Sequence, residues 1–169
     1  MENSKPAPII LGKDEGQGLS VMGGTYKILI SGKQTNGALA VIDMLIPPNG
    51  GPGPHAHAEF IESFYVIGGE VEVSSEAGKY TAAAGAFVAI PKGGIVHGFK
   101  NKSDAVAHLL CIVAPAGLEE MFEETGTPVA LGEFLPPPQM TDPEVAGKIM
   151  AIAEKYGQKL YPPDYLDKQ

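Results

Sequence analysis

The sequence predicts an all-β fold, a jelly-roll β-barrel with C-terminal α-helices. Between Tyr26 and Val113, short apolar or β-branched runs alternate with turn-forming residues, which is typical of antiparallel sandwiches and barrels. Glycine (22 residues) and proline (15 residues) are abundant in the chain of 169, so many turns are expected. After Pro115 the apolar residues recur at the spacing of a helix instead. A composition of 44% hydrophobic and 19% charged residues excludes a chain that is mostly disordered.

The barrel is predicted from eight runs that follow one another along the chain. They are YKILI, LAVIDMLI, SFYVI, EVEV, KYTAA, AFVAI, HGFKN and AVAHLLCIV. Segments rich in Gly, Pro, Asn, Asp and Ser separate the runs and mark the turns. Eight short strands within about 90 residues suit a jelly roll. We therefore expect an N-terminal extension at 1–25, the barrel at 26–114, and helices with a tail packed on the barrel at 115–169.

Two helices are expected after the barrel. The first covers 118–125 and ends at Gly126, and the second lies in TDPEVAGKIMAIAEKYG and ends at Gly157. Thr141 and Glu144 have the spacing of a capping box at the start of the second helix. We expect both helices to cover the outside of the barrel, and the alternative is that the first closes its mouth. A solvated face, rather than a metal site, is expected for the glutamates of the first helix, namely Glu119, Glu120, Glu123 and Glu124.

The charge pattern argues against two classes of partner. The net charge is −8 at pH 7 and the 12 lysines and arginines are scattered, so contacts that neutralise phosphate groups have no evident source. We expect no nucleic-acid partner and no membrane partner. No apolar stretch has the length of a secretory signal or a membrane span, which predicts a cytoplasmic protein. Cys111, within VAHLLCIVA, is expected to be a small buried side chain rather than a nucleophile.

Three of the four histidines and one carboxylate gather around two turns rich in glycine and proline. His55 and His57 are two residues apart, so in an extended segment their side chains project from the same face. Glu62 opens a run whose alternation places it on one face with Phe64. His97 opens a later run, directly after a tight turn. If these faces all point into the barrel, the four side chains converge.

This set of residue types is suited to a divalent transition metal. Such an ion accepts neutral imidazole nitrogen and carboxylate oxygen, and rigid strands fix the directions of the ligands. Three histidines and one glutamate leave one or two positions open on an ion that takes five or six ligands. Open positions are typical of catalytic sites, whereas structural sites are closed.

The two clusters resemble the two sequence motifs of the cupin superfamily. The first motif is matched in type and spacing by His55, His57, Glu62 and Gly69. The second motif, which ends in a histidine and an asparagine, is matched by Gly85, Pro91, Gly93, His97 and Asn101. The segment VAPAGLEEMFEETG, which follows the barrel, is similar to small single-domain cupins such as bacterial quercetin 2,3-dioxygenases.

The resemblance implies the fold, a cofactor and a reaction. His55, His57, Glu62 and His97 would be the ligands of one divalent transition metal, which can be Fe, Mn, Ni, Co, Cu or Zn. Glu62 would also be the catalytic base of a quercetinase-like dioxygenase acting on a small aromatic or enol-type substrate. The chain has Phe60 and Ile61 where many relatives have acidic residues, which bears on the substrate rather than on the metal. By analogy with small cupins, we also expect a homodimer, in which residues 1–25 are a candidate for an exchanged strand.

Two other functions fit the same residues. One is a metal-dependent isomerase or lyase of a small hydroxycarbonyl compound, and the other is a non-enzymatic cupin that binds a small ligand. Three polar residues near the motifs are expected to have structural roles: Glu59 in solvent, His108 hydrogen-bonded on a strand, and Asn101 shaping a turn. A substrate pocket inside the barrel is expected to be lined by Phe64, Val66, Phe87, Ile95 and Phe99.

Overall fold

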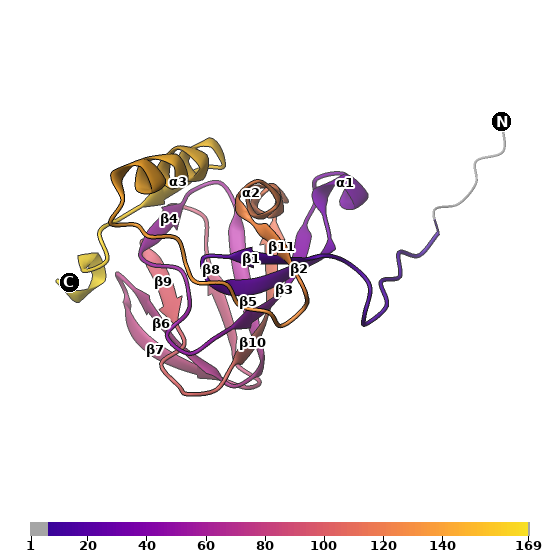
Figure 1. Ribbon diagram of the computed structural model, residues 1–169, viewed down its shortest axis with the longest axis horizontal. Helices are drawn as coiled ribbons and strands as arrows, with labels where there is room; N and C mark the ends of the chain where they lie inside the picture. Colours follow the sequence, from indigo (N-terminus) through magenta and orange to yellow (C-terminus); the bar gives the residue numbers. More distant parts are fainter. Residues whose placement is uncertain (1–6, 169) are drawn as a thin grey trace.

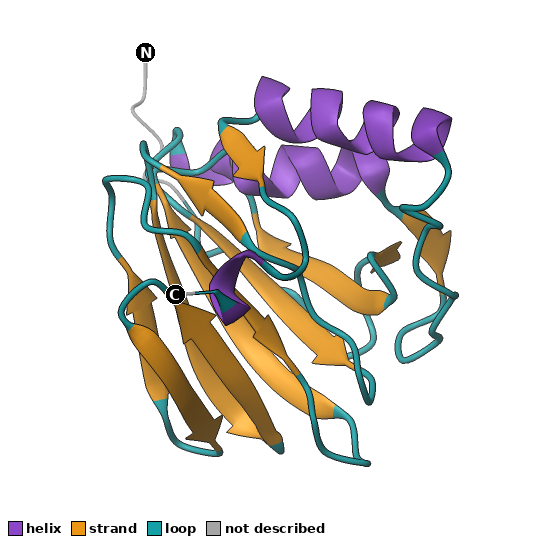
Figure 2. Cartoon of the chain, turned by 90° about the vertical axis from the view of Figure 1, so that its left-hand side faces the viewer, coloured by secondary structure: helices purple, strands orange, loops and turns teal. Residues whose placement is uncertain are grey.

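Two antiparallel sheets face each other and enclose one apolar core (Figures 1 and 2). The structure is a computed structural model that describes residues 7–168. In order across the larger sheet lie β11 (Thr127–Val129), β1 (Gly18–Val21), β2 (Gly24–Ile30), β3 (Ala40–Ile46), β10 (Ala107–Ala114), β5 (Ile61–Gly68) and β8 (Phe87–Ile90). In order across the smaller sheet lie β12 (Gln158–Leu160), β4 (His55–His57), β9 (His97–Lys100), β6 (Glu70–Ser75) and β7 (Gly78–Ala83).

All eight runs that the sequence marks as strands are strands, and the predicted jelly-roll class is confirmed. The pattern of burial explains why these runs form sheets. In β3 and β10 every second residue is buried, so one face of each strand packs into the core while the other is more exposed. Cys111 lies on the buried face of β10 with no exposed surface, as expected.

The helices lie together at one end of the barrel (Figures 1 and 2). They are α2 (Leu118–Thr125) and α3 (Pro143–Lys155), with a short α1 (Gly32–Thr35). A 3₁₀ turn, η1 (Tyr165–Asp167), lies apart from them, where Asp167 bonds to Lys79 of β7. The bounds of α2 agree with the prediction. The predicted cap of α3 is wrong by one residue, because the side chain of Asp142, not Thr141, accepts the amide hydrogen of Glu144 at 2.9 Å.

Glu119 corrects the prediction of a fully solvated glutamate face on α2. Its side chain is buried, with 1% exposed surface, while its neighbour Glu120 is exposed. The Glu119 carboxylate accepts the backbone N–H of Gly32 at 2.6 Å and that of Gly117 at 2.7 Å. It therefore joins the start of α2 to the start of α1, a long-range contact that helical periodicity does not reveal.

We expect Glu119→Ala to lower the free energy of unfolding of the metal-free protein by about 2 kcal/mol, because two backbone N–H groups lose their partner. The matched control Glu120→Ala, on the exposed side of the same turn, is expected to change it by less than about 0.5 kcal/mol. Urea denaturation measures both values. Equal losses in the two variants would contradict the structural role of Glu119.

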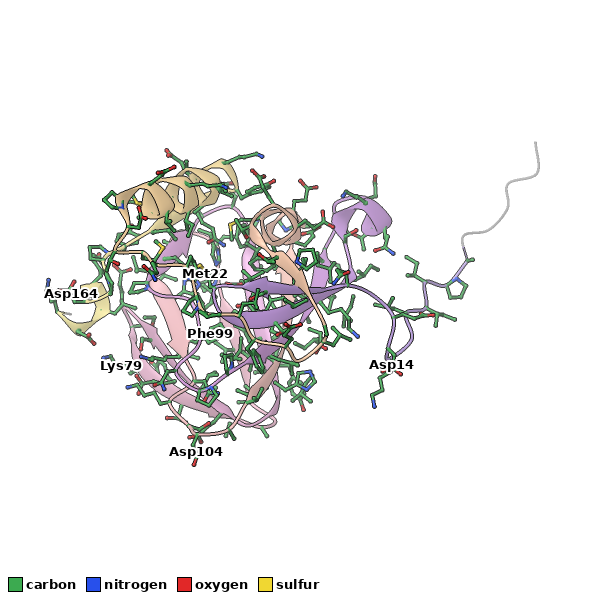
Figure 3. The ribbon with its side chains drawn as sticks, in the orientation of Figure 1. Asp14, Met22, Lys79, Phe99, Asp104 and Asp164 are labelled. Atoms are coloured by element: carbon green, nitrogen blue, oxygen red, sulfur yellow. The ribbon has the colours of Figure 1, made fainter. Side chains whose placement is uncertain are left out.

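The N-terminal segment runs along the barrel only in part. Strand β1 pairs with β2 and β11 of the same chain, whereas Ile9 and Ile10 are exposed on a segment that projects beyond Asp14 (Figure 3). Residues 1–6 of the predicted extension lie outside the described residues, and the exchange of a strand between two chains stays a prediction. Among residues 7–168, none of the helices is long and apolar enough to cross a membrane.

Candidate metal centre

The structure brings together the four side chains that the sequence singles out. His55 and His57 lie on β4, His97 is the first residue of β9 and is paired with His55, and Glu62 comes from β5 in the opposite sheet. One potential ligand atom from each of the four residues lies within 4.8 Å of the others, and all four residues are buried. The interior between the two sheets is therefore the meeting point of the group.

Glycines in the loops position the histidine strands. The loop before β4 passes so close to β9 that a Cβ atom on Gly51 would lie 2.2 Å from the carbonyl oxygen of Phe99. The φ angle of Gly51 is +127°, which favours glycine. In the turn before His97, the backbone N–H of Gly93 donates to the carbonyl oxygen of Ala58 at 3.1 Å, so the two histidine segments are tied together.

The hydrogen bonds of the imidazoles leave the same ring nitrogen free in all three histidines. Nδ1 of His55 lies 2.9 Å from the carbonyl oxygen of Gly53. Nδ1 of His57 lies 3.2 Å from the carbonyl oxygen of Phe60, and Nδ1 of His97 lies 3.0 Å from that of Ile95. A carbonyl oxygen only accepts, so Nδ1 carries the hydrogen in the neutral ring and Nε2 presents a lone pair.

This arrangement fits a bound cation. Nε2 of His57 lies 3.2 Å, and Nε2 of His97 3.4 Å, from the same carboxylate oxygen, Oε2 of Glu62. Lone pairs that face a carboxylate oxygen repel one another unless a positive charge or a proton lies between them. Backbone carbonyls that fix the tautomer and ring orientation are also typical of metal-ligating histidines. The donor set therefore suits one divalent transition metal.

Burial and close contacts keep His55 and Glu62 in the states that can bind metal. Burial, together with the nearby His97, lowers the pKa of His55 to about 4, so this imidazole is neutral at pH 7. Burial alone would raise the pKa of Glu62, but its close contacts with the imidazoles of His57 and His97 outweigh burial and hold the pKa below its usual range. Neutral imidazole and ionised carboxylate are the forms that bind a metal.

Two further side chains contact the group and were not assigned to it from the sequence. The ring of Phe60 stacks on that of His57, with centroids 4.0 Å apart and planes at 14°. Sγ of Cys111 lies 3.6 Å from Oε1 of Glu62, on the side away from the histidine contacts. Burial, and secondarily the charge of Glu62, raises the pKa of the Cys111 thiol well above its usual value.

We expect native protein to resist alkylation of Cys111 by iodoacetamide near pH 8, because the thiol is buried and stays protonated. Intact-mass spectrometry measures the extent of labelling. The control is the same protein unfolded in urea, which is expected to be labelled fully within the same time. Comparable labelling rates in the native and the unfolded protein would show that the thiol is accessible.

The predicted pocket residues lie in two different places. Phe64, Val66 and Phe99 are buried inside the barrel, where Phe64 and Phe99 pack edge to face with ring centroids 5.2 Å apart. Ile95 is partly buried against the same core. The prediction for Phe87 is wrong: it is 62% exposed on the outer face.

The register of β8 explains the error at Phe87. Glu62 and Phe64 point inward, and their partners on β8 are Ile90 and Val88. Phe87 is paired with the exposed Tyr65 instead, because successive residues of a strand face opposite sides. The run AFVAI contains apolar residues at every position, so its sequence alone does not show which face is buried.

The polar residues that were expected to have structural roles lie outside the group. Nε2 of His108 lies 2.5 Å from Oδ1 of Asp43 on the neighbouring strand β3, and Glu59 is exposed. Asn101 is fully buried, and its side-chain amide donates to the carbonyl oxygens of Ile46 (2.9 Å) and Ala105 (2.7 Å). These three interpretations are confirmed.

The C-terminal strand β12 borders the group and was not expected from the sequence. It pairs with β4 so that Gln158 is opposite His57 and Leu160 is opposite His55. The strand has three residues and follows directly after Tyr156 and Gly157 at the end of α3. Such a short segment carries no pattern of its own, and only its pairing with β4 defines it.

Comparison with known proteins identifies the barrel. Residues 42–113 match the family model of the cupin domain, Cupin_2. No curated protein matches the sequence at a significant level. Several solved structures have the same fold at low sequence identity, so they show similarity of fold alone.

Three of these structures illustrate the range of activities that their names give. A sugar phosphate isomerase of the cupin superfamily from Silicibacter pomeroyi is 23% identical, with a TM-score of 0.50 over 56% of this chain and 61% of that chain. A predicted oxalate decarboxylase from Thermotoga maritima is 21% identical, with a TM-score of 0.56 over 63% and 99%. The polyketide cyclase RemF from Streptomyces resistomycificus is 20% identical, with a TM-score of 0.55 over 64% and 80%. The chain thus spans about three fifths of the isomerase but nearly all of the decarboxylase. Residues 42–113, the part of the chain that matches the cupin domain, contain all four candidate ligands.

Proposed function

We propose that the chain is a metal-dependent enzyme whose metal is held by His55, His57, Glu62 and His97. The observation that carries the proposal is the group of three Nε2 lone pairs and one carboxylate, buried together at the interior of the barrel. A divalent transition metal bound there would supply Lewis acidity and open coordination positions. The residues of the chain hold that ion, fix the histidine tautomers and exclude water.

For the reaction, we propose a quercetinase-like dioxygenase acting on a small aromatic or enol-type substrate. The buried Phe64, Val66 and Phe99 make the interior of the barrel apolar, which suits such a substrate. Glu62 is the carboxylate of the group and in this proposal accepts the proton of the substrate hydroxyl. Its low pKa makes it a better ligand than base, so we expect the proton to stay on Glu62 only briefly.

Metal analysis followed by oxygen uptake tests this proposal. The protein is stripped with chelator, reloaded separately with iron, manganese, nickel, cobalt, copper or zinc, and assayed with quercetin and with smaller enols in an oxygen electrode. We expect uptake with at least one metal, and none with the matched variant Glu62→Gln. No uptake above buffer with any fully loaded form would contradict the dioxygenase.

A second candidate is a metal-dependent isomerase or lyase of a small hydroxycarbonyl compound. It is supported by the names of the similar structures, which include an isomerase, a predicted decarboxylase and a cyclase. Turnover that persists under strict anaerobiosis would favour this candidate over the dioxygenase. Saturable ligand binding without turnover would instead favour a non-enzymatic cupin that binds a small ligand.

We also propose that the chain forms a homodimer through the outer face of β5 and β8. The edge strand β8 and its neighbour expose an apolar surface formed by Ile61, Tyr65, Ile67 and Phe87. A second copy would cover this surface on both chains at once, as in two-fold dimers. Sedimentation equilibrium is expected to give a dimer for the wild type and a monomer for Phe87→Lys, and a wild-type monomer would contradict the proposal.

A further inference from the structure

Gln158 lies on the strand next to two histidines of the candidate metal centre, although it comes from the far end of the chain. Gln158 is the first residue of β12 and is directly opposite His57 on β4. Side chains of directly opposite residues in an antiparallel pair project from the same face of the sheet. The face that carries His57 is the one that carries the group of four, so the amide of Gln158 projects toward this group.

Gln158 is a buried polar residue without a partner for its side chain. Only 8% of its surface is exposed, and its amide makes no hydrogen bond within residues 7–168. Buried amides are nearly always hydrogen-bonded, because an unmet donor or acceptor costs free energy. In the described part of the chain, no fully enclosed side-chain nitrogen or oxygen lacks a partner, so the amide of Gln158 still borders space that solvent can reach.

The histidines of β4, with which Gln158 and Leu160 are paired, are already engaged elsewhere. Nδ1 of His57 is bonded to the carbonyl oxygen of Phe60, and the Nε2 atom of His57 faces Glu62. Nδ1 of His55, two residues along β4, is bonded to the carbonyl oxygen of Gly53. The next residue of β12, Lys159, is exposed, as alternation along a strand requires. A molecule that enters the site is therefore the natural partner of the amide.

We propose that Gln158 binds the substrate at the metal centre through its side-chain amide. The inference rests on the proposed metal site, and it concerns which part of the substrate the chain recognises. The amide N–H donates and the amide oxygen accepts, so the substrate group that satisfies both, before the hydroxyl proton passes to Glu62, is a carbonyl next to a hydroxyl. A hydroxycarbonyl or enolic compound has this pair, and its two oxygens are also suited to bind a metal.

The experiment uses the full chain loaded with Co²⁺, whose visible absorption reports binding at open coordination positions. Two probes are titrated: acetohydroxamic acid, which carries adjacent carbonyl and hydroxyl oxygens, and azide, which binds metals but does not present this pair. The variant Gln158→Met keeps the length of the side chain and removes the amide. The matched control is Lys159→Met, on the opposite face of the same strand.

We expect Gln158→Met to weaken the binding of acetohydroxamic acid about tenfold, as for the loss of one or two hydrogen bonds. The binding of azide and the Co²⁺ content are expected to stay unchanged. Lys159→Met is expected to bind both probes as the wild type does. Equal affinity of the wild type and Gln158→Met for acetohydroxamic acid would overturn the role of Gln158 alone. A wild type that shows no Co²⁺ absorption would overturn the metal site as well, so the two failures are distinguishable.

Discussion

Replacing His97 with alanine is expected to remove most of the bound metal. His97 supplies one of the three Nε2 lone pairs. It is the first residue of β9, and its Nε2 lies 3.4 Å from the carboxylate of Glu62. Altering a residue that only orients a ligand typically lowers metal affinity 10–100-fold, so loss of a ligand itself is expected to exceed about 100-fold. Elemental analysis after gel filtration, and competition with a coloured chelator, measure the occupancy and the affinity.

The controls separate ligand loss from a general effect of removing a histidine. His57→Ala is expected to behave as His97→Ala does, because both imidazoles face Oε2 of Glu62. His108→Ala removes a histidine that is bonded to Asp43 outside the group, and we expect near-normal metal content. If His108→Ala lost as much metal as His97→Ala, with both variants folded, the assignment of the ligands would be wrong.

Local pattern was enough to predict the strands and the meeting of the four side chains. The runs between turns are short and apolar, and alternation on β5 correctly puts Glu62 and Phe64 on the buried face. The spacing of His55 and His57 and the turn before His97 define positions on strands, so closing the barrel brings them together. The first helix ends where the sequence predicts because Gly126 follows it.

The features that the sequence did not reveal all depend on contacts between distant segments. Glu119 is buried because it accepts the amide hydrogens of Gly32, far away in sequence, and of Gly117. Phe87 is exposed because of its register with Tyr65, and the run around it is apolar on both faces. Gln158 borders the candidate site because three residues after α3 pair with β4. Periodicity describes one segment at a time, so it is silent on each of these pairings.

The metal-free protein is expected to lose about 2 kcal/mol of stability when the pH falls from about 7 to about 4.5 because of His55 alone. The pKa of this imidazole is about 4 in the folded chain, lowered chiefly by burial, against an ordinary value of 6.5 in the unfolded chain. Between these values the unfolded chain binds a proton that the folded chain does not. The free energy of unfolding therefore falls as the pH drops below about 6.5.

The pH range from about 7 to about 4.5 separates the contribution of His55 to stability from those of the carboxylates. The pKa values of Glu62, Glu124, Asp164 and Asp167 are all lowered in the folded chain, so their contributions are present above the ordinary carboxylate pKa and are lost mainly at still lower pH. Urea denaturation in the presence of chelator, at several pH values between about 7 and about 4.5, measures the slope that belongs to His55.

His55→Gln is the decisive comparison. Glutamine does not titrate, so the variant is expected to have a flatter dependence of stability on pH in this window, whatever its stability at pH 7. Wild-type protein reloaded with metal is expected to be more stable than the metal-free form, since a ligand that binds only the folded state stabilises it. The same slope in His55→Gln and in the metal-free wild type would show that another group takes up the proton, and that His55 is not held neutral by its burial between the two sheets.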